Sequence, residues 1–200
     1  MEITAEMVKE LRNATGVQMM VCKEALKETD GDMEKAKLFL RKKGIQLSER
    51  REGKEVNAGI IYTYNHDNRV GVIVELKCET DFVAKNEEFQ NLAKIIAMHI
   101  AWAKPIAVDE EGVHPDIEAE QEEIASFQVP EGKEKFADKI IEGKMRKFYE
   151  ESCLLNQKEM QVSEGQTTIG DMMKELSGKL TEKIKVTRFV RFEIGEDIEV

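Results

Sequence analysis

The sequence predicts an α+β protein, with an N-terminal three-helix bundle followed by an α+β domain in which helices pack on a three-stranded antiparallel sheet. Apolar residues recur at spacings of three and four over residues 3–44, as in short amphipathic helices. Two alternating apolar runs are joined by a short polar turn over residues 59–78, and a third run lies at residues 184–194. Strands first, helices next and a strand last indicate the α+β class.

Residues 3–44 are expected to form three short helices. Thr4 precedes the first, Thr15-Gly16 ends it, and Asp30-Gly31-Asp32 separates the second from the third. Gly44 predicts the end of the third helix, because glycine is a common C-terminal stop. Helices this short are marginal alone, so their apolar faces must pack together. The residues on these faces are Val8, Leu11, Met19, Cys22, Leu26, Ala36, Leu38 and Phe39.

The segment 47–57 is highly charged and nearly without apolar residues. Such a composition is typical of a solvated linker or of an exposed helical extension. We therefore predict a helical domain at residues 1–46, a linker at 47–57 and an α+β core domain at 58–200.

The larger domain is expected to open with a β-hairpin. Residues 59–64 and 70–78 alternate in polarity, and the polar stretch 65–68 between them predicts the turn. A long helix follows, with Asn86 as its N-cap and Pro105 just beyond its end.

The rest of the chain alternates between charged and apolar stretches. Residues 109–123 hold eight acids and no base, which predicts a solvated helix or a mobile projection. Apolar spacing between residues 136 and 149 predicts another helix, and Thr168 is expected to cap a further helix that ends near residue 180. Residues 184–194 alternate in polarity and predict the last strand. The apolar residues that share one alternating position are Val186, Val190, Phe192 and Ile194.

Composition narrows the classes of partner. Thirty basic against 40 acidic residues give a net charge of −10, which opposes a nucleic-acid coat because phosphate binding requires a basic face. Cys22, Cys78 and Cys153 lie far apart, which favours a reducing cytoplasm over a zinc site or a disulfide framework. The longest uncharged apolar stretch, residues 95–103, is far shorter than the roughly 20 residues that cross a bilayer. We expect a cytoplasmic protein with no membrane contact.

The residues predict neither a catalytic nor a metal centre. His66, His99 and His114 fall in a turn, a helix and an acidic loop, and no phosphate-binding glycine motif is present. Cys78 is a poor nucleophile candidate, because the neighbouring Glu79 and Asp81 raise the pKa of a thiol. We expect no cofactor.

Two segments allow two interpretations each. Residues 80–86 place Asp81 and Phe82 directly after a strand, so either Asp81 caps a turn while Phe82 enters the core, or both face a partner. Met19 and Met20 project about 100° apart on a helix. One of them can then face the bundle while the other widens an apolar surface, or both are partly buried in a small core.

Three motifs carry a resemblance to a known family. They are the stretch from Val8 to Leu26 with Arg12-Asn-Ala-Thr-Gly16 and Met19-Met20, the segment Cys78-Glu-Thr-Asp81-Phe82-Val-Ala-Lys-Asn86, and Arg188-Phe-Val-Arg-Phe-Glu-Ile-Gly195-Glu. Residues 147–157 support them. Over nearly its whole length the chain resembles bacterial elongation factor Ts, the guanine nucleotide exchange factor of elongation factor Tu.

This resemblance implies a fold, a function and a set of contacts. The bundle would be similar to ubiquitin-associated domains and would dock on the GTPase domain of elongation factor Tu, and residues 58–200 would also mediate homodimerisation. Asp81 and Phe82 would intrude beside the partner's magnesium and nucleotide site, so that GDP leaves without any covalent step. The partner-binding residues so implied are Arg12, Met19, Met20, Thr80, Asp81, Phe82 and Val83.

A rival function is a binding adaptor without exchange activity. The bundle would then capture a helix or peptide, and the acidic residues 109–123 would recruit a basic partner. This function has no need of Asp81 or Phe82.

Overall fold

A computed structural model describes residues 3–159 and 167–196. Backbone contacts divide it into two units that are each discontinuous in sequence. Within the described residues, the first unit takes in the chain up to Gly59, residues 77–90 and residues 172–185. The second takes in residues 60–76, residues 91–171 and the chain from Val186 on. The predicted boundaries at 46 and 58 stay a prediction.

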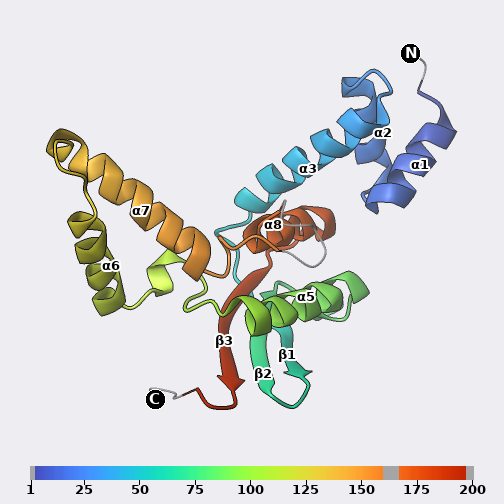
Figure 1. Ribbon diagram of the computed structural model, residues 1–200. Helices are drawn as coiled ribbons and strands as arrows, with labels where there is room; N and C mark the ends of the chain where they lie inside the picture. The colour runs from blue at the N-terminus through green and yellow to red at the C-terminus, as the bar shows by residue number, and fades with distance from the viewer. Residues whose placement is uncertain (1–2, 160–166, 197–200) are drawn as a thin grey trace. The chain divides into compact units, whose positions relative to one another are not determined.

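The N-terminal bundle has the three predicted helices, α1 (Ala5–Thr15), α2 (Met19–Glu28) and α3 (Met33–Glu49) (Figure 1). The Thr4 hydroxyl accepts the N–H of Met7 at 3.3 Å, and Gly16 ends α1 at a left-handed φ of 65°. The apolar faces meet in one core, made of Val8, Leu11, Cys22, Ala25, Leu26, Ala36 and Leu40.

The prediction that Gly44 ends the third helix is wrong, because α3 continues through it to Glu49. Gly44 serves another purpose, a close approach to α8 (Ile169–Leu180) within the first unit. A Cβ built on Gly178 of α8 would overlap the backbone of Gly44. The two glycines therefore allow two helix backbones to touch.

The sheet has three strands in the order β1-β2-β3, formed by Ala58–His66, Val70–Cys78 and Lys185–Glu193. The predicted hairpin is confirmed, and its turn is closed by a hydrogen bond of 3.0 Å from the N–H of Arg69 to the carbonyl of His66. Asp67 and Asn68 have φ values of 50° and 57°. Both central residues are thus left-handed, the turn type that matches the twist of a hairpin.

Helix α5 (Glu87–Ala103) lies across one face of the sheet (Figure 1). It begins where predicted, since the Asn86 carboxamide accepts the N–H of Glu88 at 2.8 Å. The Arg191 guanidinium of β3 donates to the carbonyl of Ala101 at 3.3 Å, which ties the strand to the helix. The buried face of α5 comprises Phe89, Leu92, Ala93, Ile96, Ala97, His99 and Ile100.

The opposite face of the sheet is apolar and exposed. Ile61 of β1, Ile73 of β2, and Val190 and Phe192 of β3 all present their side chains to solvent. The last strand is confirmed, but only Val186 of its alternating apolar residues is buried. A row of exposed apolar side chains on one sheet face is typical of an interaction surface.

Helices α6 (Pro115–Phe127) and α7 (Ala137–Ser152) form an antiparallel hairpin in the second unit (Figure 1). Most of the acidic stretch predicted at 109–123 is therefore helical, and the Tyr149 hydroxyl of α7 donates to Glu118 of α6. Ala125 and Met145 are buried, whereas Phe127 is exposed. No helix within the described ranges is long and apolar enough to span a bilayer.

We expect Gly178→Ala to lower the free energy of unfolding by about 1–3 kcal/mol, because the new methyl group must separate α3 from α8. Gly143→Ala in α7 is the matched control. A Cβ there meets no atom within 4 Å, so the same substitution should add about 0.5–1 kcal/mol by lowering the entropy of the unfolded chain. Denaturant unfolding followed by circular dichroism measures both, and equal effects of the two substitutions would contradict the close approach.

Candidate partner-binding site

The segment after β2 forms a single helical turn, α4 (Asp81–Ala84). Thr80 is its N-cap, with its hydroxyl accepting the N–H of Val83 at 3.4 Å. Val83 and Ala84 are buried, while Asp81 is exposed and Phe82 is 84% exposed. The interpretation in which Asp81 caps the turn and Phe82 enters the core is therefore wrong on both points.

Helical geometry explains this division of α4 into two faces. Successive residues are rotated by about 100°, so two adjacent residues share one side and the next two share the other. Val83 and Ala84 take the buried side and anchor the turn. Asp81 and Phe82 are thereby held outward on a short, fixed element instead of a free loop.

Glu79, just before the turn, connects three segments of the first unit. Its carboxylate accepts two hydrogen bonds from the Arg51 guanidinium, at 2.8 and 3.0 Å, and one from the backbone N–H of Lys183 at 2.6 Å. Burial alone would raise the pKa of Glu79, but the bonds from Lys183 and Arg51 outweigh it and hold that pKa below its usual value. The carboxylate therefore stays charged at neutral pH.

Thr80 is held by a second carboxylate, that of Glu182. Its N–H donates to one oxygen at 3.0 Å and its hydroxyl to the other at 2.6 Å. Glu182 is itself fixed, because the buried hydroxyl of Ser177 donates to its carbonyl at 2.6 Å.

Cys78 lies at the end of β2 and is fully buried, with its thiol donating to the carbonyl of Thr80 at 3.2 Å. Burial, together with the charges of Glu182 and Asp81, raises the pKa of the Cys78 thiol to about 11. The thiol is thus protonated at neutral pH, which leaves it a structural group and a poor nucleophile. Cys153 is buried as well.

The three predicted contact residues of the bundle lie at the junction of α1 and α2. Arg12 is exposed in the last turn of α1. Met19 and Met20 open α2 and are 49% and 68% exposed. Neither methionine is a core residue, because Cys22 fills the buried position of this turn. The two methionines thus expose apolar surface at the start of α2, and Arg12 exposes a cation in the last turn of α1.

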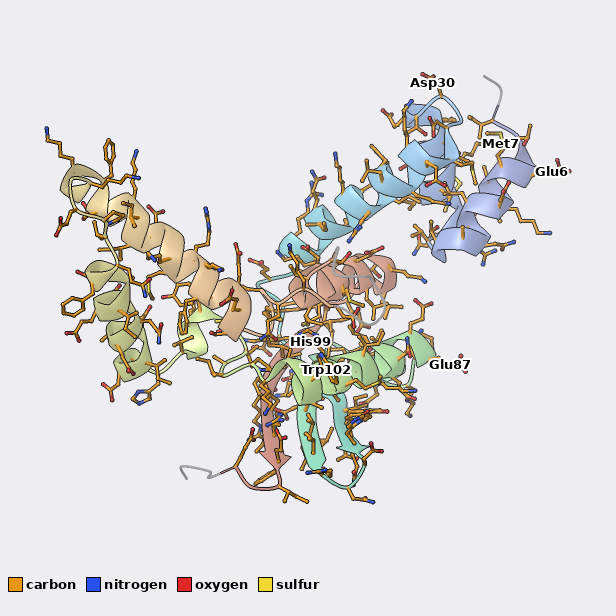
Figure 2. All side chains as sticks on the ribbon, in the orientation of Figure 1. Glu6, Met7, Asp30, Glu87, His99 and Trp102 are labelled. Atoms are coloured by element: carbon orange, nitrogen blue, oxygen red, sulfur yellow. The ribbon has the colours of Figure 1, made fainter. Side chains whose placement is uncertain are left out.

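The histidines do not form a cluster. His99 of α5 is buried and bonded to Gln157 at 3.0 Å, whereas Trp102, one turn further on, is 70% exposed (Figure 2). Burial lowers the pKa of His99, although Gln157 and Glu159 act against this effect. Among residues 3–159 and 167–196, no group of three His, Cys, Asp or Glu side chains is placed to hold a metal ion.

Sequence reasoning missed Arg51, Glu79 and Glu182 as parts of this site. Glu79 had a signal, because it stands inside the motif that runs from Cys78 to Asn86. Glu182 gave no such signal, because it lies outside the motifs and 102 residues after Thr80.

Comparison with known proteins shows to which family the chain belongs. The family model described as Elongation factor TS matches residues 7–196, a span that holds both α4 and the α1–α2 junction. The chain belongs to the elongation factor Ts family. The resemblance drawn from the three motifs is thereby confirmed, and with it a role as a translation elongation factor.

Curated members of the elongation factor Ts family match over nearly their full length. The Elongation factor Ts of Desulforamulus reducens is 49% identical over 201 aligned residues, covering 99% of this chain and 92% of its own. That of Desulfotalea psychrophila is 48% identical, covering 98% and 100%. That of Thermosipho melanesiensis is also 48% identical, covering 97% and 100%.

We expect Glu79→Gln to destabilise the protein at pH 7 and to have less effect in acid. A carboxyl whose folded pKa lies below its ordinary value of 4.5 stabilises the fold fully above that pH. That stabilisation is lost as the pH falls through the folded pKa. The measurement is denaturant unfolding of wild type and variant between pH 7 and pH 3.

The control is Glu24→Gln, which breaks a solvent-exposed pair with Lys43 at 2.9 Å and should change stability little. A Glu79→Gln effect that stays constant over the whole pH range would contradict the charged hydrogen bonds.

Proposed function

We propose that this chain is a guanine nucleotide exchange factor that releases GDP from elongation factor Tu, with Asp81 and Phe82 entering the partner beside its magnesium and nucleotide site. The observation that carries the proposal is Phe82, which is 84% exposed on a turn whose other face is buried. An aromatic ring held outward on an anchored turn can bury its apolar surface in a partner without first having to be ordered.

The exchange needs no bond to be made or broken. A factor that binds the nucleotide-free form of a GTPase more tightly than the nucleotide-bound form lowers the affinity for nucleotide. By reciprocity, the nucleotide weakens the binding of the factor by the same ratio. Such a factor requires no cofactor of its own and is not an enzyme in the usual sense.

Phe82 and Asp81 contribute in different ways. Transfer of a Phe side chain from water into an apolar gap is worth about 1.5–3 kcal/mol, enough to change an equilibrium by roughly 10- to 100-fold. A carboxylate beside a bound magnesium ion changes the local charge on which the ion's coordination depends. Thr80 and Val83 support these contacts by holding the turn: the Thr80 hydroxyl caps α4, and the buried Val83 side chain anchors it.

Arg12, Met19 and Met20 form the proposed docking surface on the GTPase domain. Their exposure at one helix junction joins an adaptable apolar contact to a guanidinium. Docking at this surface makes the entry of Phe82 a step within an existing complex, which raises its effective concentration at the nucleotide site.

We further propose a symmetric homodimer formed through the exposed sheet face. Ile61, Ile73, Val190 and Phe192 supply an apolar surface on three adjacent strands. A surface of this kind can pair with its own copy about a two-fold axis. The factor would act in the cytoplasm, where translation takes place, without touching nucleic acid directly, in keeping with its net charge of −10.

Phe82→Ala is expected to reduce the acceleration of GDP release by about tenfold or more, because the apolar insertion is lost. The measurement is the release of a fluorescent GDP analogue from elongation factor Tu. Phe127→Ala is the matched control, since Phe127 is 82% exposed but lies on α6. It should leave the rate unchanged.

No acceleration by the wild type would rule out the exchange function and favour the adaptor. Equal rates for wild type and Phe82→Ala would keep the function but exclude Phe82 as the inserted group.

Ile73→Asp should convert the dimer to a monomer, because Ile73 is exposed on the central strand of the sheet and a buried unpaired carboxylate is costly. Sedimentation velocity at several concentrations measures the change, with Phe127→Asp as the control that should remain dimeric. A wild type that sediments as a monomer would show the dimer proposal to be wrong.

A further inference from the structure

The cap residue of α4 is held by an acid from a remote part of the chain. Both donors of Thr80 reach the same carboxylate, with the N–H at 3.0 Å from one oxygen of Glu182 and the hydroxyl at 2.6 Å from the other. Hydrogen bonds to a charged acceptor are stronger than neutral ones, and a bidentate pair also fixes direction. Glu182 therefore sets both the backbone and the side-chain rotamer of Thr80, one residue before Asp81.

Glu182 is well placed to act as a fixed support. Helix α8 ends at Leu180, and Thr181 then takes a left-handed φ of 57°, which turns the chain sharply. The buried Ser177 hydroxyl holds the carbonyl of Glu182 at 2.6 Å. A non-glycine residue in this conformation costs energy and persists only where its surroundings enforce it.

A second bond of the same kind runs in the opposite direction. Glu79, the neighbour of Thr80, accepts the N–H of Lys183, the neighbour of Glu182, at 2.6 Å. Each of two adjacent residues before α4 is thus joined to one of two adjacent residues after α8. Because two neighbouring contacts hold the turn, it cannot rotate about either contact alone.

We propose that Glu182 is a positioning residue for nucleotide exchange, which holds Thr80 so that Phe82 and Asp81 are presented in the orientation that enters the partner. The inference rests on the proposed exchange function and adds a residue to it. A turn that is already ordered avoids the entropic cost of being ordered on binding. Glu182 itself makes no contact with the partner in this mechanism.

The first experiment examines the isolated protein. Glu182→Ala should raise the amide hydrogen-exchange rate of Thr80 and Val83, because Thr80 loses its acceptor and its hold on the cap. Glu182→Gln keeps one acceptor oxygen of the same shape and should give an intermediate rate. Glu175→Ala is the control, because Glu175 lies on α8 and pairs with Arg41 at 3.4 Å. It should leave both amides protected.

The second experiment measures GDP release from elongation factor Tu at saturating factor. Glu182→Ala should lower the rate by about tenfold, with partial recovery in Glu182→Gln, as expected for the loss of two charge-assisted hydrogen bonds. In a Phe82→Ala background the same substitution should lower the rate by a clearly smaller factor, because only Asp81 of the two side chains that Glu182 positions is still present. Loss of folded protein would instead lower the rate equally in both backgrounds.

The outcomes separate this inference from the function on which it rests. No exchange by the wild type overturns the proposed function, and the amide rates then decide alone whether Glu182 holds the turn. Exchange by the wild type with an unchanged rate in Glu182→Ala overturns the positioning role. An equal loss in the presence and absence of Phe82 overturns it as well.

Discussion

The carboxylate of Glu79 joins three segments that lie far apart in the sequence. It accepts bonds from Arg51, 28 residues before it, and from the backbone of Lys183, 104 residues after it. A largely buried charge is costly unless hydrogen bonds satisfy it, so the fold must bring both donors to it. Arg51, Glu79 and Lys183 each belong to a different segment of the first unit, so these bonds join all three segments, and the turn α4 begins two residues after Glu79.

Local chemistry made much of the fold predictable. Thr4 and Asn86 cap helices where the sequence indicated, and Asp67-Asn68 form the hairpin turn. Each of these features depends on a few adjacent residues, so a single sequence suffices to find it. The candidate site was predictable only in part. The motif drew attention to Phe82, but residue type alone did not decide between core and surface.

Contacts distant in sequence account for the rest. A glycine near the end of a helical pattern predicts a helix end at Gly44, whereas in the structure Gly44 meets Gly178 of another helix. In the sequence, Glu182 cannot be told from other surface acids, because its contact with Thr80 exists only in the folded chain. The alternation of apolar and polar residues in β3 predicts a strand, but it does not show which face of the sheet is covered by other elements.

The discontinuity of the first unit also governs the order in which its parts form during synthesis. The helices of the N-terminal bundle make contacts close in sequence, so they can fold soon after they leave the ribosome. Thr80, in contrast, has no acceptor until Glu182 emerges 102 residues later. Translation thus supplies the whole bundle first and the acceptor of Thr80 only much later, and a nascent chain shorter than 182 residues displays the aromatic ring without the acid that holds its turn.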